Sequence, residues 1–235
     1  MCTVSYVFSE GKVIITSNRD EQVARPALAP KTYSINGKNI CFPKDPQAGG
    51  TWYAADEHAN VLVLLNGADE KHLWQPPYRR SRGLIVLDII GSEDMLAFWA
   101  ELDLDRVEPF TIVLYFASAL YQLRWDGRQK NTQMLSPNQA HIWSSSTLYP
   151  APVRTQRSVW FEHFLRQNPQ PTSEEILEFH QFTQSDDAQN GLVINRNNSL
   201  KTLSITQTVI DTNKWKMHYR DLIEVHEFDY SFIKI

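Results

Sequence analysis

Strand-like and helix-like patterns alternate in blocks along this chain, and their order constrains the fold more than any other feature. Hairpin strands fill the first 66 residues, helical periodicity follows, strands return from residue 110, helical segments come next, and strands close the chain. Blocks of antiparallel hairpins separated by blocks of helices are typical of an α+β fold rather than of parallel βαβ units. The chain has 235 residues and no linker-like segment, so we expect a single domain over residues 1–235.

Two strand patterns indicate how the sheets are covered. Residues 61–65 (VLVLL) and 110–116 (FTIVLYF) are almost continuously apolar, so both faces of each strand are expected to be buried. Two stacked antiparallel sheets with helices on both outer faces meet this requirement. The sequence therefore predicts a four-layer αββα sandwich.

Four helices are expected to form the outer layers. Periodicity near 3.6 residues predicts them over residues 81–90, 92–102, 153–167 and 173–182. Gly91 separates the first two, and Ser92 is expected to cap the second. The closing strands are predicted over residues 191–196, 201–211 and 214–222.

Composition excludes some classes of protein and sets the expected compartment. Lys plus Arg (23) against Asp plus Glu (27) gives a net charge of −4, and no basic stripe is present to bind nucleic acid. Two cysteines, Cys2 and Cys41, cannot build a disulfide framework. No signal peptide or membrane span is recognisable, and we expect a cytoplasmic protein.

The first hairpin determines what lies beside Cys2. If Glu10 and Gly11 form a two-residue loop, paired positions sum to 21, so Cys2 lies opposite Arg19 with Asp20 one step further. A three-residue loop would instead place Asn18 opposite Cys2. Either register brings the thiol and the NRDE sequence to the same end of the hairpin.

A thiol in this position has a chemical use. A neighbouring guanidinium favours the nucleophilic thiolate. Removal of Met1 would also expose an α-amino group on Cys2, and a pKa of about 7.7–8.0 makes that amine a suitable general base. Asp20 could orient the amine. The alternative is that Cys2 is a small buried or frayed residue and that NRDE is a polar strand end.

Five short sequences together resemble a known family. MCTV at the start, SNRDE after the first hairpin, AGGTW at residues 48–52, LLNG at 64–67 and SRG at 81–83 are similar to the NRDE protein family, whose eukaryotic namesake is the transport-and-Golgi-organisation family. That family resembles the N-terminal-nucleophile hydrolases, which have an αββα fold. Their cysteine branch includes penicillin V acylase and bile salt hydrolase, which cleave linear amides.

The resemblance implies roles for individual residues. Cys2 would be the nucleophile, Arg19 and Asp20 the supporting pair, and Asn66 an oxyanion donor. Asn66 followed by Gly67 is equally readable as a strand-end turn. The acylases separate the Arg and Asp by two residues, whereas here they are adjacent, which leaves the role of Asp20 less defined.

Three further residues are candidates for substrate binding. Trp52 follows two glycines and could form a pocket wall, although it could also be a core residue. Arg82 belongs to an arginine-rich loop that could attract an anionic substrate, although such loops are usually only solvated. Ser145 stands where relatives carry an amide side chain, and it offers a single donor.

The sequence leads to two main functional hypotheses. The first is an N-terminal-nucleophile amidohydrolase that cleaves a small or acyl-bearing linear amide through a thioester on Cys2. The alternative is a haem-binding or lipid-binding trafficking protein that kept the scaffold without catalysis; a scaffold with an interaction role only is a third. The seven histidines show no metal-ligand spacing, so neither a metal nor another cofactor is expected. The substrate or cargo and the oligomeric state are not determined by the sequence.

Overall fold

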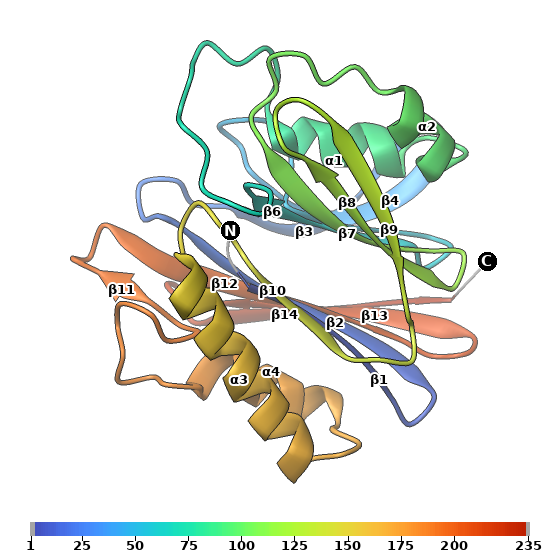
Figure 1. Ribbon diagram of the computed structural model, residues 1–235. Helices are drawn as coiled ribbons and strands as arrows, with labels where there is room; N and C mark the ends of the chain where they lie inside the picture. Colours follow the sequence, from blue (N-terminus) through green and yellow to red (C-terminus); the bar gives the residue numbers. More distant parts are fainter. Residues whose placement is uncertain (1–2, 234–235) are drawn as a thin grey trace.

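The computed structural model describes residues 3–233, which form two stacked antiparallel sheets with a pair of helices on each outer face (Figure 1). The predicted αββα sandwich is therefore confirmed. The first sheet has the order β10-β1-β2-β12-β13-β14, with β11 paired to β12. The second sheet runs in chain order from β3 to β9.

Each sheet contains seven strands. Those of the first sheet are β1 (Thr3–Ser9), β2 (Lys12–Gln22), β10 (His141–Ser144), β11 (Asn195–Arg196), β12 (Leu200–Ile210), β13 (Lys214–Asp221) and β14 (His226–Ile233). Those of the second are β3 (Leu28–Ile35), β4 (Lys38–Lys44), β5 (Tyr53–Asp56), β6 (Val61–Asn66), β7 (Phe110–Phe116), β8 (Ala119–Trp125) and β9 (Lys130–Leu135).

The helices divide between the two outer faces. α1 (Arg82–Ile90) packs on β5 and β6 of the second sheet, and α2 (Met95–Glu101) follows it. α3 (Ala151–Gln167) and α4 (Ser173–Phe182) cover the first sheet (Figure 1). The apolar residues of β6 and the first six residues of β7 are buried on both faces, as their continuous hydrophobicity predicts.

The β1–β2 hairpin settles the register that the sequence left open. Glu10 and Gly11 both have positive φ, 50° and 74°, as a two-residue hairpin turn requires. Ser9 pairs with Lys12, and at the far end Thr3 pairs with Asn18. The residue numbers of every pair from Thr3–Asn18 to Ser9–Lys12 sum to 21, so the two-residue loop is confirmed. Cys2 itself lies outside the described residues.

Several local expectations were wrong. The N-cap of α2 is Asp94 rather than Ser92, because the Asp94 carboxylate accepts hydrogen bonds from the amides of Leu96 and Ala97, each at 3.0 Å. The Ser92 hydroxyl instead donates to the carbonyl of Ile89. Of the strand predicted over residues 191–196, only β11 is extended, and β9 and β14 are additional strands.

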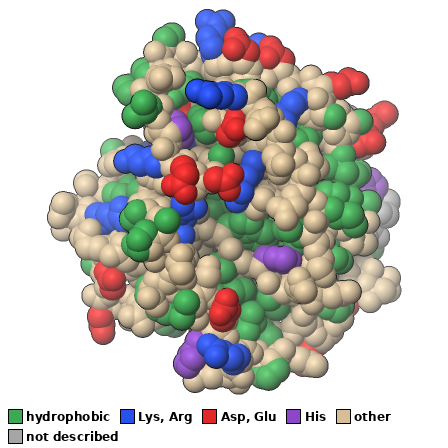
Figure 2. All heavy atoms as spheres, in the orientation of Figure 1, with side chains coloured by type: hydrophobic (Ala, Val, Ile, Leu, Met, Phe, Trp, Pro, Cys, Tyr) green, Lys and Arg blue, Asp and Glu red, His purple; other side chains and the backbone are tan. Residues whose placement is uncertain are grey.

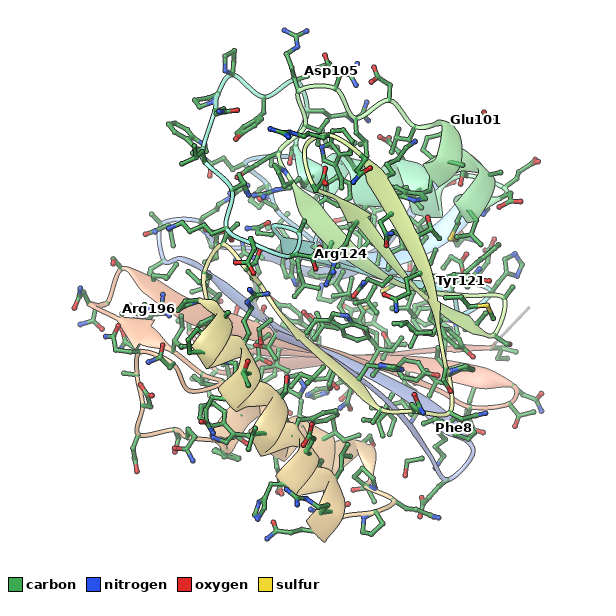
Figure 3. All side chains as sticks on the ribbon, in the orientation of Figure 1. Phe8, Glu101, Asp105, Tyr121, Arg124 and Arg196 are labelled. Atoms are coloured by element: carbon green, nitrogen blue, oxygen red, sulfur yellow. The ribbon has the colours of Figure 1, made fainter. Side chains whose placement is uncertain are left out.

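The visible surface mixes charges of both signs. Lys and Arg side chains lie interspersed with Asp and Glu on the face shown in Figure 2. Among residues 3–233, none of the helices has the length and hydrophobicity needed to cross a bilayer. Figure 3 shows Phe8 at the turn end of the β1–β2 hairpin. Arg19 and Asp20 lie at the opposite end of β2, where Arg19 shares a cavity with Arg82 at the start of α1 and Asp20 contacts Tyr149 just before α3.

Candidate functional site

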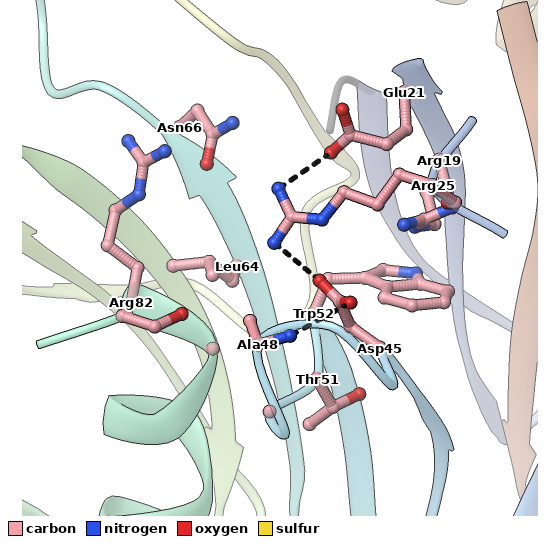
Figure 4. A pocket seen from close by; sticks show the side chains of 13 residues that line it. Arg19, Glu21, Arg25, Asp45, Ala48, Thr51, Trp52, Leu64, Asn66 and Arg82 are labelled. Carbon is pink, nitrogen blue, oxygen red and sulfur yellow. Dashed lines mark hydrogen bonds and ion pairs between the residues drawn. The ribbon is translucent and has the colours of Figure 1, made fainter. Parts of the chain in front are cut away.

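A small polar cavity lies between the two sheets, and we call it the arginine cavity. It has a volume of about 60 Å³ and is lined by side chains from β2, β6, the segments that flank β4 and β5, and the start of α1. Four of the predicted site residues line it: Arg19, Trp52, Asn66 and Arg82. Figure 4 shows Asn66 and Arg82 on one side and Arg25 with its acidic partners on the other. The fold thus brings together residues that are up to 63 positions apart in sequence (82 − 19).

Arg19 is buried at the end of β2, with 1% of its surface exposed. Its guanidinium lies over the ring of Trp52, 4.4 Å from the ring centre, and donates to the carbonyl of Arg25 at 3.0 Å. Burial lowers the pKa of Arg19, and the nearby Glu21 charge opposes that shift. The aromatic face partly compensates for the lost solvent around this cation.

Arg25 holds the two carboxylates that line the cavity. Its guanidinium lies 2.5 Å from Asp45 and 3.7 Å from Glu21. Asp45 also accepts hydrogen bonds from the amides of Gln47 and Ala48, at 3.0 and 3.2 Å. These contacts fix the loop before AGGTW against the end of β2.

Arg82 begins α1 and points along the opposite wall. It forms an ion pair with Glu108 at 2.9 Å and donates to the carbonyl of Pro109 at 3.2 Å. The second oxygen of Glu108 contacts His72 at 3.1 Å. Burial lowers the pKa of the Arg82 guanidinium, while the Glu108 charge opposes the shift.

Two glycines permit the floor of the cavity. A Cβ atom on Gly50 would lie 2.3 Å from the carbonyl carbon of Gly83, and one on Gly83 would lie 2.9 Å from the carbonyl oxygen of Thr51. The amide of Thr51 donates to the carbonyl of Gly83 at 3.1 Å. The AGGTW and SRG sequences are therefore backbone-to-backbone neighbours, which side chains at these positions would prevent.

Asn66 and Ser145 connect this cavity to a second one. Ser145 donates its hydroxyl to the Asn66 carbonyl at 2.8 Å, but it lines the second cavity, of about 290 Å³, together with Arg124 and Arg154. The side-chain oxygen of Asn66 is buried and has no hydrogen-bond partner within residues 3–233. The Asn66 side chain thus lines the arginine cavity, and Ser145, in the second cavity, holds the Asn66 backbone through its hydrogen bond to the carbonyl.

Asp20 faces away from the arginine cavity. Successive strand residues point to opposite sides of a sheet, so Asp20 lies on the helix-covered face whereas Arg19 lies between the sheets. Asp20 accepts hydrogen bonds from the hydroxyls of Tyr149 and Thr202, each at 2.5 Å. The structure therefore does not bring the Arg19 and Asp20 side chains together.

Asn18 shares that helix-covered face and joins β2 to α4. Its amide nitrogen donates to the carbonyls of His180 and Leu192, at 3.0 and 2.7 Å, so its side-chain oxygen accepts from His180 Nδ1 at 2.5 Å. Nε2 of His180 is then the acceptor for the Ser5 hydroxyl, at 2.7 Å. Burial and the charge of Arg157 lower the pKa of His180 to about 3, which keeps it neutral.

Comparison with known proteins identifies the family. A family model described as Transport and Golgi organisation 2 matches residues 1–219. The chain belongs to the Transport and Golgi organisation 2 family. A search of curated proteins finds no match to the sequence.

Solved structures share the fold of this Transport and Golgi organisation 2 family member. The Caenorhabditis elegans ortholog of N-acylethanolamine-hydrolyzing acid amidase has a TM-score of 0.60 and 11% identity, covering 88% of this chain and 92% of its own. A variant of conjugated bile acid hydrolase from Clostridium perfringens has a TM-score of 0.57 and 8% identity, with coverages of 97% and 92%. The chain therefore shares the overall fold of these two hydrolases.

Sequence reasoning missed several residues of this family member's site. Glu21 belongs to the NRDE sequence, but the sequence alone predicts no role for it. No local sequence pattern predicts the ion pair between Arg25 and Asp45, because this pair depends on a contact between two loops. His180 and Asn18 likewise meet only through the docking of α4 on β2. Within the described part of the chain, no group of three or more His, Cys, Asp or Glu side chains is arranged to hold a metal ion.

Proposed function

We propose that this protein is an N-terminal-nucleophile amidohydrolase in which Cys2 forms a thioester with a linear amide substrate. One observation carries the proposal: the hairpin register places Thr3 opposite Asn18, and the next residue of β2, Arg19, lines a buried polar cavity. Continuing the same register by one residue would set Cys2 opposite Arg19, and cross-strand partners share a face of the sheet. The thiol would then meet the arginine cavity.

Two further observations support the proposal. Structures with the same fold carry the names of hydrolases, an N-acylethanolamine-hydrolyzing acid amidase ortholog and a conjugated bile acid hydrolase. Two residues that the proposed mechanism uses, Arg19 and Asn66, also line the same cavity. Arg19 supplies a buried positive charge, which favours a thiolate over a thiol. Asn66 supplies a side-chain amide at the cavity wall.

In the proposed acylation step, the Cys2 thiolate attacks the substrate carbonyl carbon and the carbonyl electrons move onto oxygen. The amide nitrogen of Asn66 and a backbone N–H donate to that oxyanion. The α-amino group of Cys2, freed by removal of Met1, takes the thiol proton and passes it to the leaving amine. Collapse of the tetrahedral intermediate breaks the C–N bond and leaves an acyl thioester.

In the second step, water hydrolyses that thioester. The α-amine removes a proton from the attacking water, the C–S bond breaks, and the proton returns to sulfur. The products are a carboxylic acid and an amine. Asp20 lies on the other face of β2, so we assign it an indirect role, in which it holds the strand end through Tyr149 and Thr202.

Intact mass spectrometry tests the mechanism. Purified protein should lack Met1, and incubation with a panel of acyl amides should add an acyl mass that is lost again with hydroxylamine. Cys2→Ala should abolish the adduct and the turnover while keeping the melting temperature within about 2 °C, because the change removes one sulfur atom at the chain end.

Cys41→Ala is the matched control, because Cys41 is a buried thiol of the second sheet whose pKa burial raises to about 12. That variant should acylate like the wild type. Full activity in Cys2→Ala, or in protein that retains Met1, would refute the N-terminal nucleophile. We propose a cytoplasmic location as part of this function, since reducing conditions preserve the thiol.

The second candidate function is a carrier of haem or lipid. The family description supports this candidate because it names transport. Haem titration separates the two candidates. A stoichiometric Soret shift without amide turnover would favour the carrier, and turnover without the shift would favour the hydrolase. The carrier remains an untested prediction.

A further inference from the structure

The arginine cavity contains more hydrogen-bond donors than the protein itself uses. Nε of Arg19 and Nε1 of Trp52 are buried, and neither has a hydrogen-bond partner within residues 3–233. Both side chains line the cavity, with 1% and 2% of their surfaces exposed. A buried N–H group without an acceptor costs roughly 1–3 kcal/mol. Against these two donors, the side-chain oxygen of Asn66 is a buried acceptor without a partner in the same cavity, so the balance favours a ligand that accepts hydrogen bonds.

The charges around the cavity favour an anionic acceptor. Glu21 and Asp45 are bound by Arg25. Glu108 is shared by Arg82 and His72. Within the described chain, no carboxylate lies within ion-pair distance of Arg19, even though its guanidinium is buried. Among the described residues, the Arg19 guanidinium therefore has no ion-pair partner of its own, and Glu21 and Asp45, which Arg25 holds, act on it only at longer range.

The start of α1 adds to this preference. Ser81, Arg82 and Gly83 line the cavity, and the side chain of the N-cap residue Ser81 makes no capping hydrogen bond. The first amides of a helix carry a partial positive charge and attract anions. α1 has nine residues, so its N-terminal end directs a developed dipole toward the same space as Arg19 and Trp52.

We propose that the arginine cavity binds a single carboxylate group of a substrate or cargo molecule. The planar guanidinium fork of Arg19 matches a carboxylate, whose second oxygen can accept from the Trp52 indole or from the start of α1. The volume of about 60 Å³ suits one small group. Glu21 and Asp45 disfavour a doubly charged phosphate. This site does not depend on the chemistry proposed for Cys2.

Nuclear magnetic resonance on the full-length protein tests the site by binding rather than turnover. Sodium acetate is titrated at constant ionic strength, against acetamide and inorganic phosphate, while the indole N–H signals of the seven Trp residues are followed. Trp52→Phe assigns the reporter signal. Acetate should shift the Trp52 indole saturably, and acetamide should shift it at least tenfold less at equal concentration.

Variants locate the bound group. Arg19→Gln should weaken acetate binding at least tenfold, whereas Arg79→Gln, an exposed arginine paired with Asp103, should leave it unchanged. If Arg19→Gln does not fold, the contrast between acetate and acetamide in the wild type decides the question. Equal responses to both probes, no saturable response, tighter binding of phosphate, or acetate binding that survives Arg19→Gln would each overturn the carboxylate site. Because acetate binding is read without turnover, failure of the hydrolase proposal would not affect this result.

Discussion

Nδ1 of His180 lies 2.5 Å from the side-chain oxygen of Asn18, and this contact ties α4 to the strand that carries Arg19. Ser5 donates to the other ring nitrogen, so the neutral ring uses both of its positions. A proton on Nε2 would require the Ser5 hydroxyl to turn from donor to acceptor and would add a charge to a site that is fully buried. The packing of α4 against β1 and β2 is therefore stable only while His180 is neutral.

Acid should weaken the fold through this residue. The pKa of His180 falls from 6.5 to about 3, so between those values the unfolded chain binds a proton that the folded chain does not. The contribution is complete above pH 6.5 and is lost as pH falls below it, with a slope of about 1.4 kcal/mol per pH unit. Urea unfolding at pH 7.0, 6.0 and 5.5 should show stability falling by about 1.2 kcal/mol in total, with the slope steepest at the lowest pH. His180→Gln should flatten it, and His163→Gln, at an exposed position, should not.

Loss of the Tyr149 hydroxyl should destabilise the fold, because it removes a hydrogen bond from Asp20, a buried carboxylate on β2. Asp20 has 2% of its surface exposed and accepts from Tyr149 at 2.5 Å. Tyr149→Phe removes a hydrogen bond to a buried carboxylate and should lower the free energy of unfolding by about 1.5–3 kcal/mol. Chemical denaturation measures this change in the free energy of unfolding. Tyr121→Phe, at a half-buried position on β8, is the control. An equal loss of stability there would show that the hydrogen bond from Tyr149 to Asp20 adds nothing beyond the loss of any tyrosine hydroxyl.

Gly50→Ala should disturb the cavity floor. The added Cβ would lie 2.6 Å from the Leu84 amide nitrogen and closer still to the Gly83 carbonyl carbon. Both are backbone atoms, which cannot rotate away as the end of a side chain can. Overpacking of this kind costs about 1–3 kcal/mol and should move the start of α1, with Arg82, away from the cavity.

The neighbouring glycine provides the control for that change. Gly49 has φ +76°, and a Cβ added there would lie 4.0 Å from its nearest neighbour, a side-chain atom of Leu84, so Gly49→Ala tests backbone strain without overlap. The melting temperature should fall further for Gly50→Ala than for Gly49→Ala. A smaller loss at Gly50 would mean that the two loops separate readily and that close approach is not required.

Turn chemistry and hydrophobic patterning predicted most of the fold because both act locally. Glu10 and Gly11 fixed the register of the first hairpin, and the apolar run of β6 required covering layers on both sides. β14 was missed although Phe228, Tyr230 and Phe232 alternate with polar residues, and Phe232 stacks on Trp215 with ring centres 4.1 Å apart. That signal was present and could have been used.

The candidate site was only partly predictable. Arg19, Trp52, Asn66 and Arg82 belong to short recognisable sequences, and they meet at one cavity. The pairing of Arg25 with Asp45 and the docking of His180 arise from contacts between distant elements, which no local pattern encodes. The opposite orientation of Asp20, by contrast, follows from strand alternation and could have been deduced from Arg19 alone.

Arg157 should matter more than any other arginine of α3. It is fully buried, its guanidinium lies 3.6 Å from the ring centre of Tyr149, and it donates to the Thr3 hydroxyl and the Gly191 carbonyl, each at 2.5 Å. Each hydrogen bond from a charged donor is worth roughly 1.5–3 kcal/mol, so Arg157→Gln should lower the free energy of unfolding by at least about 3 kcal/mol.

The same variant should slow reactions at the chain start, because Thr3 loses the contact that holds it on β1 under α3. The rate of Cys2 acylation, measured by intact mass, is therefore expected to fall along with stability. Arg154→Gln on the same helix is the matched control: its partner Glu70 is 81% exposed at 3.4 Å, so the change should stay within about 0.5 kcal/mol. If both variants lose stability equally while Cys2 reactivity is unaltered, Arg157 supports the helix alone and does not position the first strand.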